Sequence, residues 1–522
     1  MNRVGRLALI QIVAAVLLAL AAVVLVSGRQ NPGASPGPSS PSSGGASPTA
    51  SSVAQASPPS TGTPPPTRSP SPTPTPSPAP TATPALTPSP SSPGSASPTP
   101  TPVRTIPPTA AALDPGSVDR ASIDLRVSYD VKLRLAYDSR AFTVDSLMTI
   151  ENTSGGPIDR LELNTIAARL GRIDIRAASV ASKAVSVNVR DQTLIMPLGG
   201  VLPDGGMVQA RLIFRSTLRA DTAGSNWMFA RVNGVVDAYR WLPWVSKPYA
   251  FDRPNIGDPW ITPVSPSVRV AITTDRPLVI ATSGERVSAS GLTQTFLAEN
   301  VRDFAIAAAP DFRTGSAVVG DTTVRVYYRP GGPGSTLLAQ AKGALAKMEA
   351  LVGPYPYRTY RVAQSGGGYA IESPGLVWIP RGAPSSNLAY LVHHETAHQW
   401  FYGIVGGDQA NEPFTDEAMA DFLTRRVLGT RRASRCATAR LDLSIYRYSN
   451  ACYYEVVYIQ GGNFIDDLRV RMGSSAFWAG VRAYIAENRF AIAPTKTLLD
   501  TLDAHTPLDL VPRFEPRFPR LY

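Results

Sequence analysis

The sequence has few cysteines and histidines: 522 residues include two cysteines and four histidines. Two cysteines exclude a scaffold that is held together by many disulfides. Glycine shows no three-residue period, and proline and glycine occur throughout the chain, which excludes collagen and a coiled coil. The net charge is +11, yet no run of five or more Lys or Arg occurs. Scattered basic residues indicate a solvated surface that faces an anionic envelope, and we expect no nucleic-acid partner.

Acidic residues and lysine are absent between residues 31 and 110, where Arg68 and Arg104 are the only charged residues and 25 of the 50 prolines occur. A segment of Pro, Ser, Thr and Ala cannot bury enough apolar surface to offset the entropy lost on ordering. We therefore predict a disordered Pro/Ser/Thr-rich stalk over residues 29–116. Two interpretations stay open for it: a spacer that holds a domain away from a membrane, and an inert linker.

An apolar segment lies at the N-terminus. Residues 7–26 contain one polar residue, Gln11, and follow Arg3 and Arg6. As a helix, this segment would be about 30 Å long, which is the thickness of a bilayer core. The arginines would stay on the cytoplasmic side. We predict a single-pass cell-membrane anchor over residues 1–28, with a cleaved signal peptide as the alternative. Either reading places the remaining chain outside the cytoplasm.

The remaining chain predicts a multidomain α+β protein with two folded domains. Over residues 117–315, short alternating apolar segments separated by Gly, Asp, Pro and Asn predict an all-β domain. Over residues 316–522, helical apolar spacing predominates; residues 335–351 have it, and Gly353-Pro354 then signals a helix end. The expected strands include 123–129, 131–135, 210–214, 268–273, 296–298, 323–328, 360–363 and 376–379.

Three of the four histidines lie together, and residues 394–398 read His-Glu-Thr-Ala-His. Residues 387–402 contain no Pro or Gly, so we expect a helix there. On a helix, His394 and His398 share a face, and both imidazoles can bind one zinc ion at about 2.0–2.1 Å. Glu395 lies one position round, where its carboxylate would reach a water molecule at the metal. His393 points about 100° away, and we interpret it as structural or as a support for the ligands.

A hydrolytic zinc site needs a third protein ligand and one open position. Glu417 follows His398 after eighteen intervening residues and lies at the start of a second expected helix. A loop through Gly406-Gly407 would return this helix, and with it the Glu417 carboxylate, to the metal. Two roles stay open for Thr415 and Asp416: orienting the third ligand, or capping the helix N-terminus.

These motifs resemble the gluzincin metallopeptidases of the aminopeptidase N family. That family also has Gly-Ala-Met-Glu-Asn, or Gly-Gly-Met-Glu followed by Pro-Gly-Leu, and residues 367–377 read Gly-Gly-Tyr-Ala-Ile-Glu-Ser-Pro-Gly-Leu-Val. The resemblance implies that Glu372 binds the free α-amine of a peptide. Residues 458–461 read Tyr-Ile-Gln-Gly, similar to the family's Tyr-x-Lys-Gly, which implies that Tyr458 stabilises the tetrahedral intermediate. Over about 118–522, the likeness implies a β-domain followed by a thermolysin-like α/β zinc peptidase domain.

The sequence departs from the family pattern at several positions. Ile371 and Ser373 stand where the family has Met and Asn, Tyr369 replaces a glycine, and Gln460 replaces a lysine. The large helical C-terminal domain of the eukaryotic-type enzymes, which closes over the active site, is expected to be absent because the chain ends at Tyr522. In the family that domain also helps to bind the far end of the peptide, so its expected absence leaves open which peptide lengths are accepted and how the C-terminal carboxylate is recognised.

The two cysteines bracket the segment that precedes Tyr458. In an exported domain, Cys436 and Cys452 could form a disulfide that fixes this wall of the cleft, and two unrelated buried thiols are the alternative. Tyr453 could line the pocket or belong to the core. The sequence carries no signal for an oligomeric state.

The prediction for function is a zinc metallopeptidase that removes N-terminal residues from peptides outside the cytoplasm. One Zn²⁺ ion would be held by His394, His398 and Glu417, with Glu395 as general base and Tyr458 as oxyanion donor. The altered surroundings of the predicted amine-binding glutamate leave a zinc endopeptidase as one alternative. A low-turnover peptide-binding or sensory ectodomain on the same fold is the other.

Overall fold

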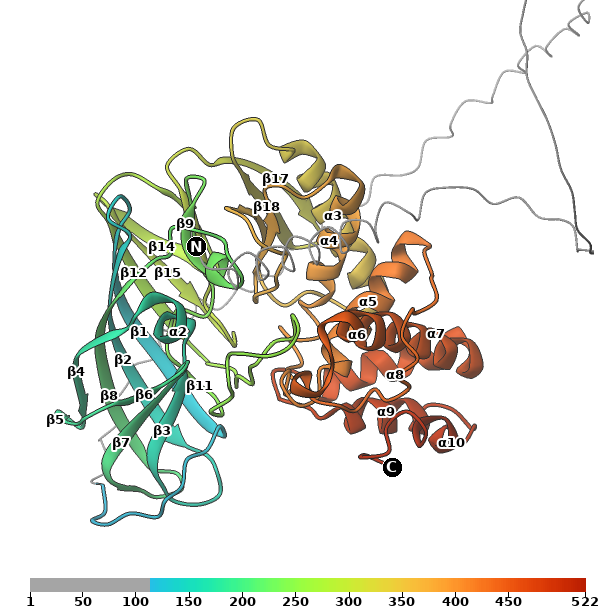
Figure 1. The fold of residues 1–522 in the computed structure, drawn as a ribbon, viewed down its shortest axis with the longest axis horizontal. Helices are drawn as coiled ribbons and strands as arrows, with labels where there is room; N and C mark the ends of the chain where they lie inside the picture. The colour runs from blue at the N-terminus through green and yellow to red at the C-terminus, as the bar shows by residue number, and fades with distance from the viewer. Residues whose placement is uncertain (1–112) are drawn as a thin grey trace, which may run out of the picture. The chain divides into compact units, whose positions relative to one another are not determined.

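The structure, a computed structural model, describes residues 113–522. The predicted membrane anchor, and the predicted stalk as far as residue 112, lie outside the described residues. Within residues 113–522, no helix is both long enough and apolar enough to span a membrane. These residues fold into a β-sheet-rich part followed by a mixed part that is mostly helical (Figure 1).

The β-sheet-rich part is built from an eight-stranded sheet and two four-stranded sheets. The large sheet has the order β14-β15-β12-β1-β2-β8-β4-β5, and the smaller ones have the orders β13-β16-β10-β9 and β11-β3-β7-β6. Neighbouring strands pair antiparallel except β1 and β12. The elements are β1 (Leu125–Ala136), β2 (Ala141–Asn152), β3 (Ile158–Asn164), α2 (Ile166–Gly171), β4 (Asp174–Val180), β5 (Lys183–Ala184), β6 (Asn188–Arg190), β7 (Thr193–Leu202), β8 (Met207–Thr217), η2 (Asn226–Met228), β9 (Phe229–Val232), β10 (Val235–Ala238), β11 (Trp244–Val245), β12 (Val268–Thr274), β13 (Val279–Thr282), β14 (Glu285–Ser290), β15 (Thr293–Ala298) and β16 (Ile306–Ala309).

Alternation of buried and exposed side chains explains the long central strands. In β1, odd-numbered residues from Leu125 to Leu135 are buried and their neighbours are mostly exposed, as expected for a strand with one solvated face. The sequence predicts two strands here, 123–129 and 131–135, and that division is wrong. Asp130 occupies an exposed position in the alternation, so its charge stays in water and the strand continues through it.

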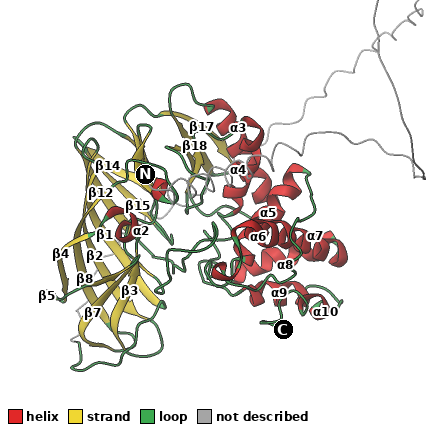
Figure 2. Ribbon diagram, in the orientation of Figure 1, coloured by secondary structure: helices red, strands yellow, loops and turns green. Residues whose placement is uncertain are grey.

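The second part has one sheet, of order β17-β18-β19-β20, together with the helices at the C-terminal end of the chain (Figure 2). β18, β19 and β20 are parallel, and β17 joins β18 antiparallel at the sheet edge. The elements are β17 (Arg313–Val319), β18 (Thr322–Tyr328), α3 (Gly334–Val352), β19 (Thr359–Ser365), β20 (Leu376–Pro380), α4 (Ser385–Ala397), α5 (Phe414–Leu428), η3 (Ile445–Arg447), α6 (Asn450–Tyr453), η4 (Tyr454–Gln460), α7 (Gly461–Met472), α8 (Ser474–Glu487), α9 (Thr495–Ala504) and α10 (Val511–Phe514).

Two apolar cores form, of which the first also takes in residues of β18, β19 and β20, and a buried arginine joins the two parts. Arg302, which is 1% exposed, comes from the β-sheet-rich part. Its guanidinium donates to the carbonyl oxygens of Gly403, Ile404 and Ala491 at 3.3, 3.3 and 3.1 Å. These carbonyls belong to the loop that follows α4 and to the segment before α9. One fully buried cation therefore satisfies backbone acceptors of the second part.

Candidate metal centre and active site

Helix α4 carries the His-Glu-x-x-His motif and ends earlier than the sequence predicts. The expected helix over residues 387–402 is Ser385–Ala397 in the structure, and His398 is its C-terminal cap. His398 keeps right-handed helical dihedrals (φ −61°, ψ −12°), so it still shares a face with His394. After His398 the chain turns, and the Gly403 amide donates to the His398 carbonyl at 2.8 Å. This turn directs the chain toward α5.

Helix α5 brings a carboxylate to the two histidines from its first turn. Glu417 Oε2 lies 3.4 Å from His394 Nε2 and 3.5 Å from His398 Nε2. The two Nε2 atoms are 3.2 Å apart. All three residues are buried, with at most 6% of their surface exposed. The sequence thus predicts correctly that a loop and a second helix return Glu417 to the motif.

The three atoms fit one zinc ion. Zinc ligands at 2.0–2.1 Å in a tetrahedron lie about 3.3–3.4 Å from one another, and the three observed separations of 3.2, 3.4 and 3.5 Å are close to that edge. Glu417 Oε2 is buried and has no hydrogen-bond partner within residues 113–522. A buried carboxylate oxygen without a partner carries a desolvation penalty that a cation would remove. Three ligands leave the fourth position open, as in hydrolytic sites.

Asp416 orients His398, a role that the sequence does not predict. Its Oδ1 lies 2.7 Å from His398 Nδ1, and the Phe401 carbonyl lies 3.1 Å from the same nitrogen. Both neighbours are acceptors, so Nδ1 carries the ring proton and the lone pair on Nε2 points toward Glu417. Neither expected role of Asp416 is observed, because the α5 cap residue is Pro413 and no side chain caps the helix. The neighbouring Thr415 donates to Thr495.

His394 is held by aromatic rings. Its Nδ1 is buried and has no hydrogen-bond partner among the described residues. The imidazole stacks on Tyr390, with centroids 5.6 Å apart, and on Tyr458, with centroids 5.4 Å apart. Tyr390 is itself anchored, because its hydroxyl donates to Asp421 at 2.6 Å and Arg425 pairs with the same carboxylate at 2.6 Å. Stacking therefore replaces the hydrogen bond that usually fixes a histidine ligand.

Glu395, the predicted general base, and Tyr458, the predicted oxyanion donor, are buried and feel the charge of Glu417. Glu395 is 4% exposed, and burial raises its pKa to about 8. Burial and the adjacent Glu417 carboxylate raise the pKa of Tyr458 well above its usual 10. Burial also acts on Glu417, but the adjacent imidazoles of His394 and His398 outweigh it and lower the Glu417 pKa to about 2. A cation at this centre would favour the charged form of each carboxylate.

Glu372 reaches the same centre from the segment between β19 and β20. Its Oε1 accepts a hydrogen bond from Gln409 Nε2 at 3.2 Å, and that nitrogen also donates to Asp416 at 2.7 Å. Gln409 Oε1 in turn accepts from Arg240 at 3.0 Å. Arg240 is buried, and its guanidinium lies over the Trp260 ring. The β-sheet-rich part therefore supports the Glu372 carboxylate through a hydrogen-bonded chain.

Sequence reasoning missed both Gln409 and Arg240. Neither residue belongs to a recognisable motif, and their contacts join positions 169 residues apart. Burial of Glu372 raises its pKa well above the usual value, with the nearby Asp258 adding to the effect. Asp258 is another buried carboxylate of the β-sheet-rich part that the sequence did not single out.

The glycine segment before Glu372 is fixed by the β-sheet-rich part. Asn233 donates to the Gly366 carbonyl at 2.7 Å, and Asp237 accepts from the Gly366 amide at 2.8 Å. At Gly368, φ is +85° and an added Cβ would lie 2.1 Å from the Trp227 ring. Both the left-handed backbone and the close approach of the indole require glycine there. Tyr369, next in the chain, is 56% exposed.

Three further expectations have clear outcomes. The structure joins Cys436 and Cys452 by a disulfide, as one of the two alternatives predicts. Tyr453 is buried in the core and also contacts the Tyr458 ring, with centroids 5.9 Å apart. His393 is separate from the ligand atoms: its Nδ1 lies 2.8 Å from the Ala389 carbonyl, and burial lowers its pKa. We therefore assign His393 a structural role.

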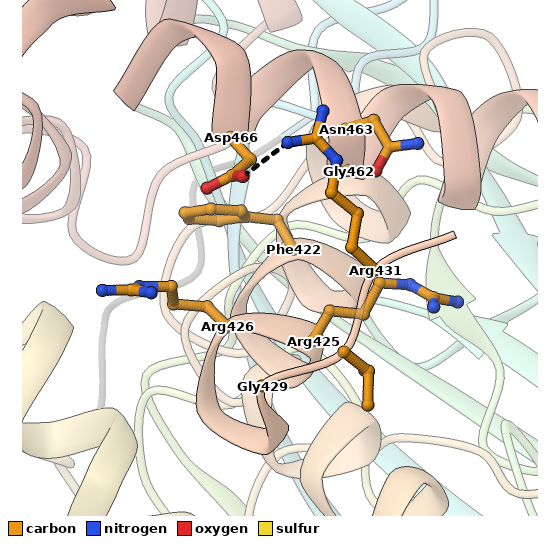
Figure 3. A pocket seen from close by; sticks show the side chains of 9 residues that line it. Phe422, Arg425, Arg426, Gly429, Arg431, Gly462, Asn463 and Asp466 are labelled. Carbon is orange, nitrogen blue, oxygen red and sulfur yellow. Dashed lines mark hydrogen bonds and ion pairs between the residues drawn. The ribbon is translucent and has the colours of Figure 1, made fainter. Parts of the chain in front are cut away.

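A separate surface cavity of about 230 Å³ lies where α5 ends and α7 begins. Figure 3 shows Arg431 reaching Asp466 across it, with Phe422 forming one wall. Arg425 turns back to pair with Asp421. Two of the arginines at this cavity are therefore neutralised by carboxylates, and none of the three zinc-ligand candidates lines it.

Comparisons with known proteins identify the fold. No protein-family model matches the chain, and no curated protein matches it. Among solved structures, an M1 zinc metallopeptidase mutant from Deinococcus radiodurans is 19% identical with a TM-score of 0.59, covering 75% of this chain and 94% of that one. The same enzyme without the mutation is 18% identical with a TM-score of 0.58, covering 76% and 94%.

A third structure of that Deinococcus radiodurans protein holds a Tyr-Ser-Ala substrate; it is 19% identical with a TM-score of 0.58 and covers 76% of this chain and 94% of that one. The expectation of a β-domain followed by a zinc peptidase domain is confirmed at the level of the fold. The chain thus has the fold of the M1 zinc metallopeptidases, and it carries a buried His-His-Glu triad that fits one zinc ion.

Proposed function

We propose that this protein is a zinc metallopeptidase that removes N-terminal residues from peptides. The observation that carries the proposal is the triangle formed by His394 Nε2, His398 Nε2 and Glu417 Oε2, which matches the edge of a zinc tetrahedron. Glu395 lies next in the chain to the first of these ligands and is buried with them. The peptide held by the structurally similar Deinococcus radiodurans protein supports a peptide as substrate.

Each residue would have a distinct part in hydrolysis. Zinc at this triad would polarise the scissile carbonyl and lower the pKa of a water molecule. Glu395 would accept a proton from the attacking water and deliver it to the leaving amine. The Tyr458 hydroxyl would donate to the carbonyl oxygen as negative charge develops there, an interaction typically worth about 3–4 kcal/mol.

Glu372 would select a free N-terminus. It is 4% exposed. Among residues 113–522, the side chain that donates a hydrogen bond to it is the neutral amide of Gln409. A buried carboxylate without a cationic partner favours binding of an ammonium group. An α-ammonium held there would position the first peptide bond of the substrate over the metal centre.

The proposed location is the outer face of the cell membrane. The apolar segment over residues 7–26, preceded by Arg3 and Arg6, supports a single-pass anchor with the rest of the chain outside the cytoplasm. The Cys436–Cys452 disulfide supports the same assignment, because disulfides persist in oxidising compartments.

The test is a mass-spectrometric assay with the full-length, zinc-loaded chain and a peptide pool. Half of the peptides have free N-termini and half are acetylated. We expect single residues to be lost from free termini only. Glu395→Gln should abolish turnover and retain zinc, and Glu372→Gln should mainly raise KM. Glu299→Gln, at an exposed carboxylate of the β-sheet-rich part, is the matched control and should leave activity unchanged.

Other outcomes of this assay would correct the proposal. Internal cleavage in both halves of the pool would make the protein an endopeptidase and remove Glu372 as the amine anchor. Zinc binding without cleavage of any peptide would favour a peptide-binding ectodomain. Near-normal activity of Glu395→Gln would refute its assignment as the general base.

A further inference from the structure

Tyr458 lies on a π-helical turn. The turn, η4, spans Tyr454–Gln460 and lies between α6 and α7. A π-helix is a rare conformation that occurs mostly as single turns within α-helices, frequently at functional sites. Its hydrogen bonds join residues five apart, whereas an α-helix joins residues four apart. Because the α-helical pattern is the preferred one, we expect contacts from other segments to stabilise the π-helical turn. The position of the Tyr458 ring depends on those contacts.

Residues 430–440, which we call the brace, supply these contacts. The brace follows the Gly429 cap of α5 and has no helix or strand of its own. It is joined to α6, immediately before η4, by the disulfide between Cys436 and Cys452. A covalent bond thus ties an irregular segment to the start of the π-helical turn.

The first turn of η4 is bound to the brace by ion pairs. Glu455, which is 5% exposed, accepts from Arg432 at 2.8 and 2.9 Å. It also accepts from the Arg435 guanidinium at 2.9 and 3.1 Å and from the Arg435 amide at 2.9 Å. Five charge-assisted hydrogen bonds on one buried carboxylate hold it far more firmly than an exposed ion pair would.

The end of η4 is bound to the brace through an amide. Gln460 Nε2 donates to the Cys436 carbonyl at 2.5 Å and to the Ser434 hydroxyl at 3.2 Å. In α7, Asn463 donates to the Arg432 carbonyl at 2.9 Å. The brace therefore touches the chain before η4, in its first turn, at its last residue and beyond it.

A direct line of contacts connects the brace with the Tyr458 ring. The Arg432 guanidinium lies over the ring of Tyr454, 5.8 Å from its centroid. On the same helical turn, Tyr454 contacts Tyr458, with ring centroids 4.7 Å apart. Tyr458 also stacks on the ligand candidate His394. Displacement of Arg432 or of η4 would therefore move Tyr458 relative to the metal centre.

We propose that the brace positions Tyr458 for transition-state stabilisation, with Glu455 and the Cys436–Cys452 disulfide as its two main fastenings. Glu455 and the cysteines are positioning residues, because they act through Tyr458 and touch neither substrate nor metal ligands. The inference rests on the proposed function, since it assigns Tyr458 as the oxyanion donor.

The experiment compares two brace variants of the full-length, zinc-loaded chain: Glu455→Gln, and Cys436→Ser combined with Cys452→Ser. Loss of one oxyanion donor lowers kcat by about 10²–10³, and a misplaced donor loses part of that. We expect kcat to fall by about tenfold or more, with KM and the zinc Kd within about threefold of wild type. Arg211→Ala is the matched control, because it removes the bidentate pair with Asp145 on the distant β-sheet.

A second background separates positioning from general stability. In Tyr458→Phe the donor is absent, so the brace variants should cause little or no further loss of the residual kcat. The proposal would be refuted if the brace variants lowered kcat by the same factor in the wild-type chain and in Tyr458→Phe. It would also be refuted if they left the kcat of the chain with Tyr458 unchanged.

Failure of the proposed function would be visible separately, as a wild-type protein that binds zinc and cleaves no peptide. In that case, hydrogen exchange of residues 454–460 tests the brace. Faster exchange at this turn in Glu455→Gln, with unchanged exchange in the β-sheets, would support it. Unchanged exchange at 454–460 would overturn it.

Discussion

Replacing Asp416 with asparagine should weaken zinc binding although Asp416 is not a proposed zinc ligand. The two carboxylate oxygens each receive a hydrogen bond: Oδ1 faces His398 Nδ1 at 2.7 Å, and Oδ2 accepts from Gln409 at 2.7 Å. Both partners are donors. Asparagine offers one acceptor and one donor, so one of the two contacts becomes a donor facing a donor.

The size of the effect follows from these two contacts. Losing a hydrogen bond between a buried donor and a charged acceptor costs about 1.5–3 kcal/mol, and His398 Nδ1 would then keep only the Phe401 carbonyl. Either orientation of the asparagine amide loses one contact. In one orientation, the amide NH₂ faces His398 Nδ1, which then lacks its carboxylate acceptor. In the other, it faces Gln409 Nε2, which also supports Glu372. Loss of the residue that orients a histidine ligand typically costs 10–100-fold in metal affinity, which is about 1.4–2.7 kcal/mol.

The assay is equilibrium competition between the protein and a chelating dye for zinc. We expect the zinc Kd of Asp416→Asn to rise by about 10–100-fold. Asp442→Asn is the matched control, because Asp442 is also a buried aspartate but pairs with Arg440, away from the proposed ligands. The control should lose stability and keep its zinc affinity. A zinc Kd for Asp416→Asn within twofold of wild type would refute the reasoning.

Three further predictions concern the supports of the site. Tyr390→Leu should raise the zinc Kd measured by dye competition, because His394 loses one stacking ring; Tyr390→Phe, which keeps the ring, should have the smaller effect, and equal effects would contradict the stacking argument. Arg432 and Arg435 outweigh burial and lower the Glu455 pKa to about 2 from 4.5. A lowered folded-state pKa stabilises the protein above pH 4.5, so up to about 3 kcal/mol should be lost as the pH falls from 4.5 to 2. Denaturant titrations should show a flatter acid limb for Glu455→Gln; an identical limb would disprove this contribution. Gly368→Ala should lower both Tm and kcat, because its Cβ would overlap Trp227, whereas Gly382→Ala, in open space, should lower neither.

The ligand set could be predicted from the sequence because the information is local. His394 and His398 are one helical turn apart, and that spacing alone places two imidazoles on one face. The structure ends α4 three residues after His394, yet the geometry survives because the cap residue, His398, keeps helical dihedrals. Glu417 needed only a turn and a second helix, and both have local signals in the sequence.

The supports of the site could not be predicted, because each of them depends on how distant segments pack. Asp416 faces His398 instead of capping its own helix, and only the path of the loop over residues 399–413 determines this. Arg240 reaches Gln409 from a different part of the chain, and a single buried arginine among apolar neighbours carries no sequence signal. The division of β1 failed for a related reason: Asp130 resembles a turn residue until the sheet shows which face is solvated.

The departures from the family pattern acquire a physical meaning once the supports are known. Gln460 stands where the family has lysine, and its amide here binds the carbonyl of a disulfide-linked cysteine and accepts from Arg517 at 2.9 Å. A lysine at this position could donate to the carbonyl but could not accept from the arginine. Glutamine at this position therefore fits the contacts that the brace and Arg517 offer. The motif residues must supply metal-binding and proton-transfer groups, whereas Gln460 has only to satisfy the carbonyl and the guanidinium beside it, so a side chain other than lysine fits there.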